Sequence, residues 1–156
     1  MKNDQNAPAG YTWTARVRWV GDLESVVYAR NHAFTVGQPA SFKETDPHPS
    51  AVEYLLGALG GDLTNGFQIC ASQIGIQIDN MELRLSGRLN NALVYLGVIG
   101  EQGDPGFAEI TGTLYASADA DEAALQEIWQ TTLARSPIVN TLKRSVRISI
   151  ELQLVI

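Results

Sequence analysis

Cysteine is nearly absent from this chain: Cys70 is the only one among its 156 residues. A single cysteine excludes an intramolecular disulfide, and neither it nor the two histidines, His32 and His48, have the spacing of a zinc site. We therefore expect no metal and no other cofactor. The polar start, residues 1–10, lacks the apolar centre of a signal peptide, which favours a cytoplasmic location.

Long apolar runs and positive charge are also scarce. The longest apolar stretch, around Leu55 to Leu63, contains glycine and an aspartate and is too short to span a bilayer. The net charge is -6, whereas a nucleic-acid surface needs a concentrated basic patch. We therefore expect neither a membrane nor a nucleic acid as a partner.

The apolar content, 45% of the residues, is enough for one packed domain over 1–156. Alternation of apolar and polar residues predicts a half-buried strand from Tyr11 to Trp19, and a second extended run covers 24–36. Three prolines then make 38–50 an irregular loop.

A long helix is predicted from Ser50 to about Ile74. One stripe at helical spacing is apolar: Val52, Leu55, Leu56, Leu59, Leu63, Phe67, Cys70 and Ile74. The other faces are rich in glycine, each of which lowers helix stability by about 1 kcal/mol relative to alanine. Close packing against another helix or a partner subunit would compensate, so we expect this helix to be buried.

The remainder alternates again between strand and helix patterns. Strands are predicted around 81–86, after a turn at 103–106, and over 146–154. Between the last two, Asp119 and Glu122 have capping-box spacing and open an amphipathic helix that ends before Pro137. The pattern indicates an α+β fold.

Three segments carry a resemblance to a known family: 49–64, 105–110 and 136–142, read as PSAVEYLLGALGGDLT, PGFAEI and SPIVNTL. They resemble the OsmC/Ohr family, the osmotically inducible and organic-hydroperoxide-resistance proteins. The resemblance implies antiparallel sheets around a long buried central helix, in an intertwined homodimer with sites at the subunit boundary. It also implies thiol-dependent reduction of organic hydroperoxides in stress responses.

The two cysteines of that family are both replaced here. Asp62 stands where the family has its peroxide-attacking cysteine, and Ser136, followed by Pro137, stands where the family has a Cys-Pro pair. In active members an arginine holds the attacking thiol as thiolate, the nucleophilic form, and a glutamate positions that arginine. The resemblance makes Arg30 the candidate arginine and Glu53 the candidate glutamate.

Two interpretations of Asp62 stay open. A carboxylate does not reduce a peroxide, so Asp62 and Arg30 can be a structural ion pair at a former redox site. Alternatively, Asp62 is a polar anchor in a retained apolar pocket that binds a small molecule with a donor group. Phe42, His48 and Cys70 are candidates for lining that pocket. Alternatively, Phe42 packs down the loop before the helix, and His48 lies on the surface of that loop.

Cys70 lies two turns beyond Asp62 on the apolar stripe, where a cysteine is usually an inert, buried small hydrophobe. Ser136 has no histidine near it in the motif to act as a base, and Ser-Pro is more simply a helix stop. The leading hypothesis is an OsmC-like stress protein that has lost the two-cysteine chemistry but keeps a pocket at the dimer interface for a small apolar or peroxide-like ligand. The alternatives are a weak hydroperoxide reductase using Cys70 and an external thiol, and a purely structural or interaction homodimer.

Overall fold

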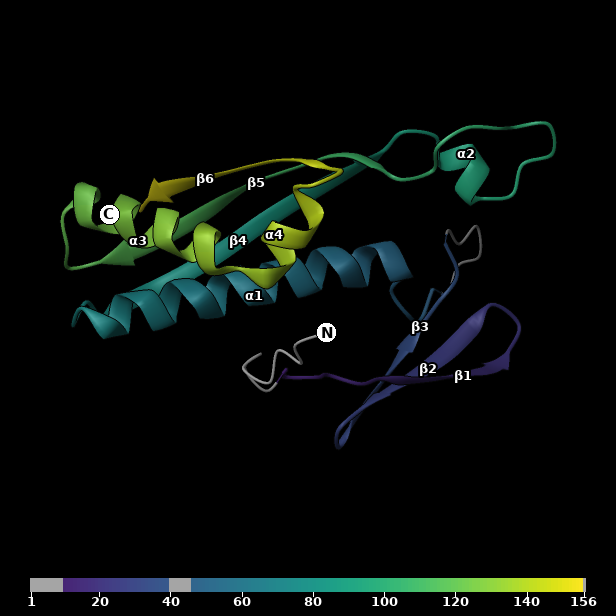
Figure 1. Cartoon of the computed structure of the whole chain (residues 1–156), viewed down its shortest axis with the longest axis horizontal. Coiled ribbons are helices and arrows are strands. Elements are labelled where there is room, and N and C mark those ends of the chain that lie inside the picture. The colour runs from purple at the N-terminus through teal and green to yellow at the C-terminus, as the bar shows by residue number, and fades with distance from the viewer. Residues whose placement is uncertain (1–9, 40–45, 156) are drawn as a thin grey trace, which may run out of the picture. The chain divides into compact units, whose positions relative to one another are not determined.

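A computed structural model describes residues 10–39 and 46–155 of the chain. The chain forms two compact units, of which the first ends at Ala51 and the second begins at Val52. Their elements are labelled in Figure 1. That 1–156 is one domain stays a prediction. None of the described helices is both long enough and apolar enough to cross a membrane.

The N-terminal unit is an antiparallel meander of β1 (Arg16–Gly21), β2 (Glu24–Ala29) and β3 (His32–Val36). The first strand starts five residues later than the predicted strand, and the run 24–36 is two strands rather than one. The chain reverses at Arg30, whose φ of 52° is left-handed. Because neither Arg30 nor Asn31 is a glycine, the sequence gives only a weak turn signal there.

The strands of this meander have no core of their own. None of the residues in β1, β2 or β3 is buried, and Val17 and Trp19 are 62% and 69% exposed. The predicted half-buried first strand is therefore exposed on this chain. Small sheets need a covered apolar face for stability, so this surface requires a packing partner.

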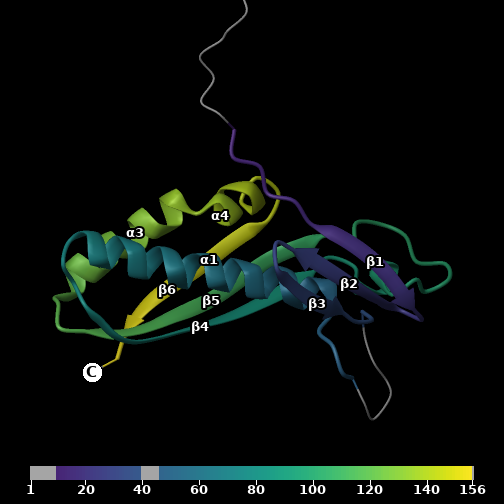
Figure 2. The ribbon, with the colours of Figure 1, turned by 90° about the horizontal axis from the view of Figure 1, so that it is seen from below.

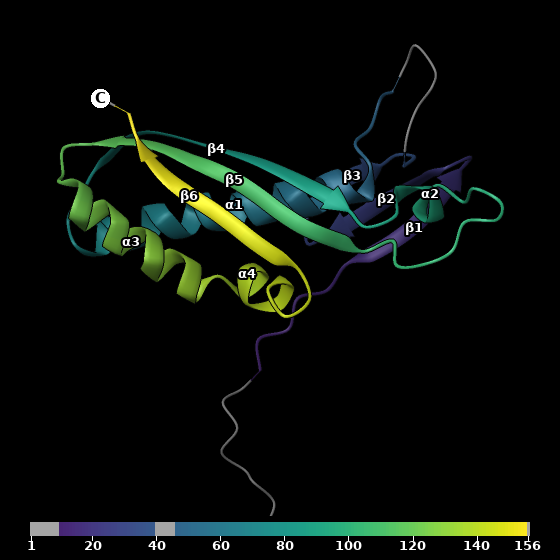
Figure 3. The same cartoon turned by 90° about the horizontal axis from the view of Figure 1, so that it is seen from above.

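The C-terminal unit consists of a three-stranded sheet and four helices, of which α2 lies in the loop between β4 and β5. Its strands are β4 (Ile78–Leu89), β5 (Phe107–Ala118) and β6 (Arg147–Leu154), in the order β4-β5-β6. Its helices are α1 (Ala51–Gln73), α2 (Ala92–Tyr95), α3 (Glu122–Arg135) and α4 (Pro137–Leu142). Figure 2 shows α1 and α3 in front of the strands, and Figure 3 shows the sheet from the opposite side.

One strand pairing differs from the antiparallel sheets that the resemblance predicts. β4 and β5 are antiparallel, but β5 and β6 are parallel over Glu109–Ala116. The reason is the connection: α3 and α4 cross from the end of β5 back to its beginning, so β6 starts where β5 starts. The second sheet is therefore mixed.

The core lies between this sheet and its helices. The α1 stripe is buried at Leu59, Leu63 and Phe67, and the Phe67 ring lies 6.2 Å from that of Trp129 on α3. The indole N–H of Trp129 donates to the backbone carbonyl of Ile150 on β6, 3.1 Å away. The opposite stripe of α1, including Gly57 and Gly61, is exposed on this chain. A single chain thus buries one face of the long helix.

The helix α3 begins two residues later than the sequence pattern predicts. Its N-cap is Asp121 rather than Asp119, because the Asp121 carboxylate accepts a hydrogen bond of 2.7 Å from the backbone N–H of Ala124. Its C-cap is Ser136, which at the same time is the N-cap of α4, with Pro137 in the first turn. The predicted Ser-Pro stop signal is confirmed.

The loop between β4 and β5 contains a helix that the sequence pattern does not predict. The Asn91 side chain caps α2 by accepting from the backbone N–H groups of Leu93 and Val94. A helix of four residues shows too little periodicity to be recognised among the surrounding apolar residues.

Candidate functional site

The two residues that the resemblance assigns to the family's cysteine positions meet in the C-terminal unit. Asp62 lies in the middle of α1, and Ser136 lies in the bend between α3 and α4. The Ser136 hydroxyl donates a hydrogen bond of 2.5 Å to the Asp62 carboxylate, across 74 residues of sequence. These two side chains therefore occupy adjacent places, as an attacking and a resolving thiol would have to.

Local structure fixes the direction of that hydrogen bond. The Ser136 oxygen accepts from the backbone N–H of Val139 at 2.9 Å, which is the N-cap interaction of α4. Because the hydroxyl has a single hydrogen, that hydrogen is left for Asp62. Ser136 is only 4% exposed, so both of its roles are protected from water.

A cavity of about 330 Å³ opens beside this pair. Its size lies at the lower end of the usual range for ligand pockets, roughly 300–1,000 Å³. The walls come from two elements that face each other, α1 and the end of α3, and from the bend that follows. The lining residues are Asp62, Asn65, Gly66, Ile69, Cys70, Thr132, Arg135 and Ser136.

Cys70 lines the same cavity, and an arginine that sequence reasoning missed lies beside it. The Arg135 Nη1 atom is 3.8 Å from the Cys70 Sγ atom and donates a 2.9 Å hydrogen bond to the Gln73 side chain. Cys70 itself is buried, with 6% of its surface exposed. Arg135 precedes Ser136 directly, so its position next to the Ser-Pro motif was the signal available in the sequence.

Thr132 is the second residue that sequence reasoning missed. It is buried, its hydroxyl donates to the backbone carbonyl of Ile128 at 2.8 Å, and its methyl group faces Gly66 across the cavity wall. A Cβ at Gly66 would lie 3.2 Å from that methyl carbon, so a small residue is needed there. Helical spacing from Trp129 on α3 could have indicated Thr132 as an inward position.

The predicted arginine and glutamate belong to different parts of the chain. Arg30 is exposed in the β2–β3 turn of the N-terminal unit. Glu53 is exposed in the first turn of α1, nine residues before Asp62 and thus on roughly the opposite side of the helix. The roles of Arg30 and Glu53 in a site with Asp62 stay predictions.

The two loop candidates lie before α1. His48 is half-buried and lines a hollow of about 190 Å³ formed by the N-terminal unit alone, together with Asp22, Glu24 and Asp46. Phe42 lies outside the described residues. In 10–39 and 46–155, no group of three His, Cys, Asp or Glu side chains is placed to hold a metal ion.

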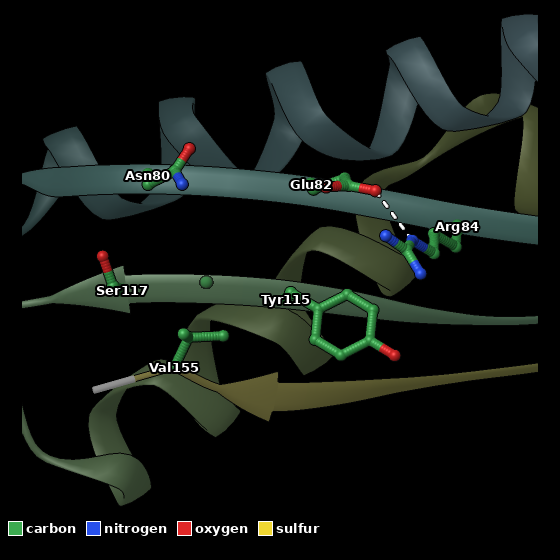
Figure 4. A pocket seen from close by; sticks show the side chains of 7 residues that line it. Asn80, Glu82, Arg84, Tyr115, Ser117 and Val155 are labelled. Atoms are coloured by element: carbon green, nitrogen blue, oxygen red, sulfur yellow. Dashed lines mark hydrogen bonds and ion pairs between the residues drawn. The ribbon is translucent and has the colours of Figure 1, made fainter.

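A second hollow, of about 350 Å³, lies on the outer face of the β4-β5-β6 sheet (Figure 4). Glu82 and Arg84 form an ion pair of 2.7 Å there, and the hydrogen bond that Arg84 donates to the Glu82 carboxylate raises the pKa of Arg84. Both side chains are more than 60% exposed, and an exposed pair of this kind contributes little to stability. None of the predicted site residues lines this hollow, so the cavity at Asp62 is the better candidate site.

Comparisons with known proteins agree with the fold. Residues 43–151 match the family described as OsmC-like protein. None of the curated protein sequences matches this one. A crystal structure of an OsmC-like protein from Mycoplasma pneumoniae is similar with a TM-score of 0.80 at 17% identity, covering 95% of this chain and 100% of that one.

Two further structures place the similarity within a wider group. The organic hydroperoxide resistance protein OhrB of Bacillus subtilis has a TM-score of 0.63 at 17% identity, covering 92% of this chain and 98% of its own. An OsmC-like protein of unknown function from Vibrio cholerae has a TM-score of 0.74 at 10% identity, covering 92% of this chain and 100% of that one. At these identities the likeness concerns the fold.

Proposed function

This chain belongs to the OsmC-like protein family, and from that premise we propose that it is a stress-related member without the two-cysteine hydroperoxide reductase chemistry, whose cavity binds a small molecule. The observation that supports this most strongly is the hydrogen bond between Asp62 and Ser136, the two positions of the family's cysteines. A hydrogen bond between a hydroxyl and a carboxylate occupies the place where two thiols would have to form a disulfide.

The chemistry of these two side chains explains the proposed loss. A thiolate takes up one peroxide oxygen as a sulfenic acid, and a second thiol then displaces that oxygen as water and forms a disulfide. Neither a carboxylate nor a serine hydroxyl can be oxidised and reduced in this cycle. Ser136 is moreover engaged by Val139 and Asp62, with no histidine beside it among the residues that line the cavity.

The cavity supports a binding function, because it has not been filled by larger side chains. About 330 Å³ stays open beside Asp62 and Ser136, and Ile69, whose surface is 57% exposed, presents an apolar wall. An apolar pocket with a few polar groups is the usual form of a small-molecule site. A purely structural role would not require this space.

Homodimer formation is part of the proposal. The β1-β2-β3 meander lacks a core of its own, and α1 presents a groove of about 380 Å³ lined by Gly57, Gly60, Gly61 and apolar side chains. Both surfaces are suited to packing against a second copy, as the family resemblance implies. We also propose a cytoplasmic location, which the single cysteine supports, since no intramolecular disulfide can form.

A second candidate function rests on the contact between Arg135 and Cys70. The thiolate is the form of a cysteine that attacks peroxides. Cys70 could then be oxidised to a sulfenic acid by an organic hydroperoxide and reduced by two equivalents of an external thiol. Its 6% exposure argues against this candidate, because an attacking thiolate must be reached by the peroxide.

Consumption of cumene hydroperoxide under excess dithiol tests the proposal. We expect native protein and Cys70→Ser to show the same rate as the dithiol blank. Turnover that disappears in Cys70→Ser would replace the proposal with the second candidate. The double variant Asp62→Cys/Ser136→Cys is a control for the assay, because it returns thiols to both family positions.

A further inference from the structure

The Asp62 carboxylate has hydrogen-bonding capacity that the described residues, 10–39 and 46–155, do not use. Its Oδ2 atom accepts from Ser136, which takes one of about four acceptor sites on a carboxylate. Among the described residues of the C-terminal unit, 52–155, no lysine or arginine forms an ion pair with it. The carboxylate therefore lines the cavity as an acceptor without a cation from its own unit.

The wall of the cavity that follows Asp62 along α1 is mainly apolar. Gly66 and Cys70 follow Asp62 at helical spacing on the same side of α1, and Ile69 lies beside them. From Asp62 to Cys70 the helix rises about 12 Å. A ligand placed along this wall would cover the exposed Ile69 side chain, which water now contacts.

Arg135 makes the two ends of the cavity differ in charge. Its guanidinium lies at the Cys70 end, held by Gln73, and so a positive charge is fixed about two helical turns from Asp62. A cationic group is attracted to the Asp62 end and repelled from the Arg135 end. A ligand with one cationic head and an apolar body matches both ends.

We propose that the cavity binds a primary alkylamine in its ammonium form, with the ammonium group on Asp62 and the alkyl chain along Gly66, Ile69 and Cys70. This inference rests on the proposed binding function and names its ligand class. The ammonium group donates to the free Asp62 oxygen, a charge-assisted hydrogen bond, and the chain excludes water from the apolar wall. A carboxylate ligand is repelled at the Asp62 end, and the guanidinium at the other end is already engaged by Gln73 and Cys70.

Titration of the native protein with hexylamine, hexanol and hexanoate, followed by amide NMR shifts, tests this inference without any variant. We expect hexylamine to bind at least tenfold more tightly than hexanol, with shifts in 62–70 and 132–136, and hexanoate not to bind. A diamine of the same length should bind more weakly than hexylamine, because its second ammonium group would approach Arg135.

Variants then assign the effect to the carboxylate. Asp62→Asn, which keeps the shape of the side chain, should weaken hexylamine binding about ten- to a hundredfold. Glu127→Gln, an exposed acid on α3 that does not line the cavity, is the matched control and should bind like the native protein.

Three results would overturn the inference in different ways. Equal affinity for hexanol and hexylamine would show that the cavity binds ligands but not by charge, which leaves the proposed binding function intact. Hexylamine binding that occurs only in Arg30→Gln would mean that Arg30 already neutralises Asp62. No binding of any of the three compounds would contradict the binding function itself.

Discussion

The adjacency of Asp62 and Ser136 can be tested by replacing both with cysteine. In Asp62→Cys/Ser136→Cys, made in a Cys70→Ser background, only the two new thiols are present. The side chains they replace are in hydrogen-bond contact at 2.5 Å, so a rotamer adjustment brings the sulfur atoms within bonding distance. We expect a disulfide to form quantitatively under mild oxidation.

The stabilisation expected from this disulfide follows from the loop that it closes. The two positions are 74 residues apart, and the chain-entropy relation gives about 4.5 kcal/mol for a loop of that length. For a chain of this size, each kcal/mol raises Tm by roughly 2–4 °C. The oxidised variant should therefore melt about 9–18 °C above its own reduced form, less any strain in the new bond.

Thiol titration and intact mass report the bond, and thermal denaturation with and without reductant reports its effect. The matched control is Gln68→Cys/Ser136→Cys in the same background, because Gln68 is an exposed residue of α1 that does not line the cavity. Both of its thiols should stay free within the monomer. Two free thiols in the Asp62/Ser136 variant would refute the placement of the α3–α4 bend on α1.

Three other predictions follow from individual contacts. Ser136→Ala removes both the N-cap of α4 and the partner of Asp62, and should lower the free energy of unfolding by about 2–4 kcal/mol in urea denaturation; a loss below about 0.5 kcal/mol would contradict these two roles. Gly112→Ala should lower the free energy of unfolding by about 1–3 kcal/mol, because a Cβ at Gly112 would overlap the backbone carbonyl oxygen of Arg84. The neighbouring Thr113→Ala is the control, and equal stability of the two variants would show that β4 and β5 can move apart to make room for the Cβ. The hydrogen bond from Arg88, and then its charge, lower the pKa of Glu109 below its ordinary 4.5. A lowered folded-state pKa contributes stability that is fully present above the ordinary pKa and is lost as the pH falls through the folded-state pKa. Glu109→Gln should therefore be less stable than the native protein at about pH 7, and this difference should shrink as the pH falls below 4.5; a difference independent of pH would mean that charge is not involved.

Much of the C-terminal unit can be predicted from the sequence, because burial there follows regular periods. Leu59, Leu63 and Phe67 recur at helical spacing and are all fully buried. Ile110 and Leu114 of β5 alternate with polar neighbours and are buried as well. Local patterns of this kind identify each element and the face that it buries.

Long-range and exceptional features could not be predicted in the same way. The parallel pairing of β5 and β6 depends on the path of α3 and α4, and the turn at Arg30 uses a left-handed residue that is not glycine. The contact between Asp62 and Ser136 spans 74 residues, and no local pattern in the sequence indicates it. Arg135 was missed because an arginine at the end of a helix is more often a favourable interaction with the helix dipole than part of a site.

The loss of peroxide chemistry is tested by intact-mass analysis of the native protein after exposure to an organic hydroperoxide without any thiol. We expect the protein mass to be unchanged, Cys70 to stay a free thiol and the hydroperoxide to be recovered in full. Loss of one equivalent of hydroperoxide, with Cys70 one oxygen atom heavier and captured by a sulfenic-acid reagent, would contradict this expectation.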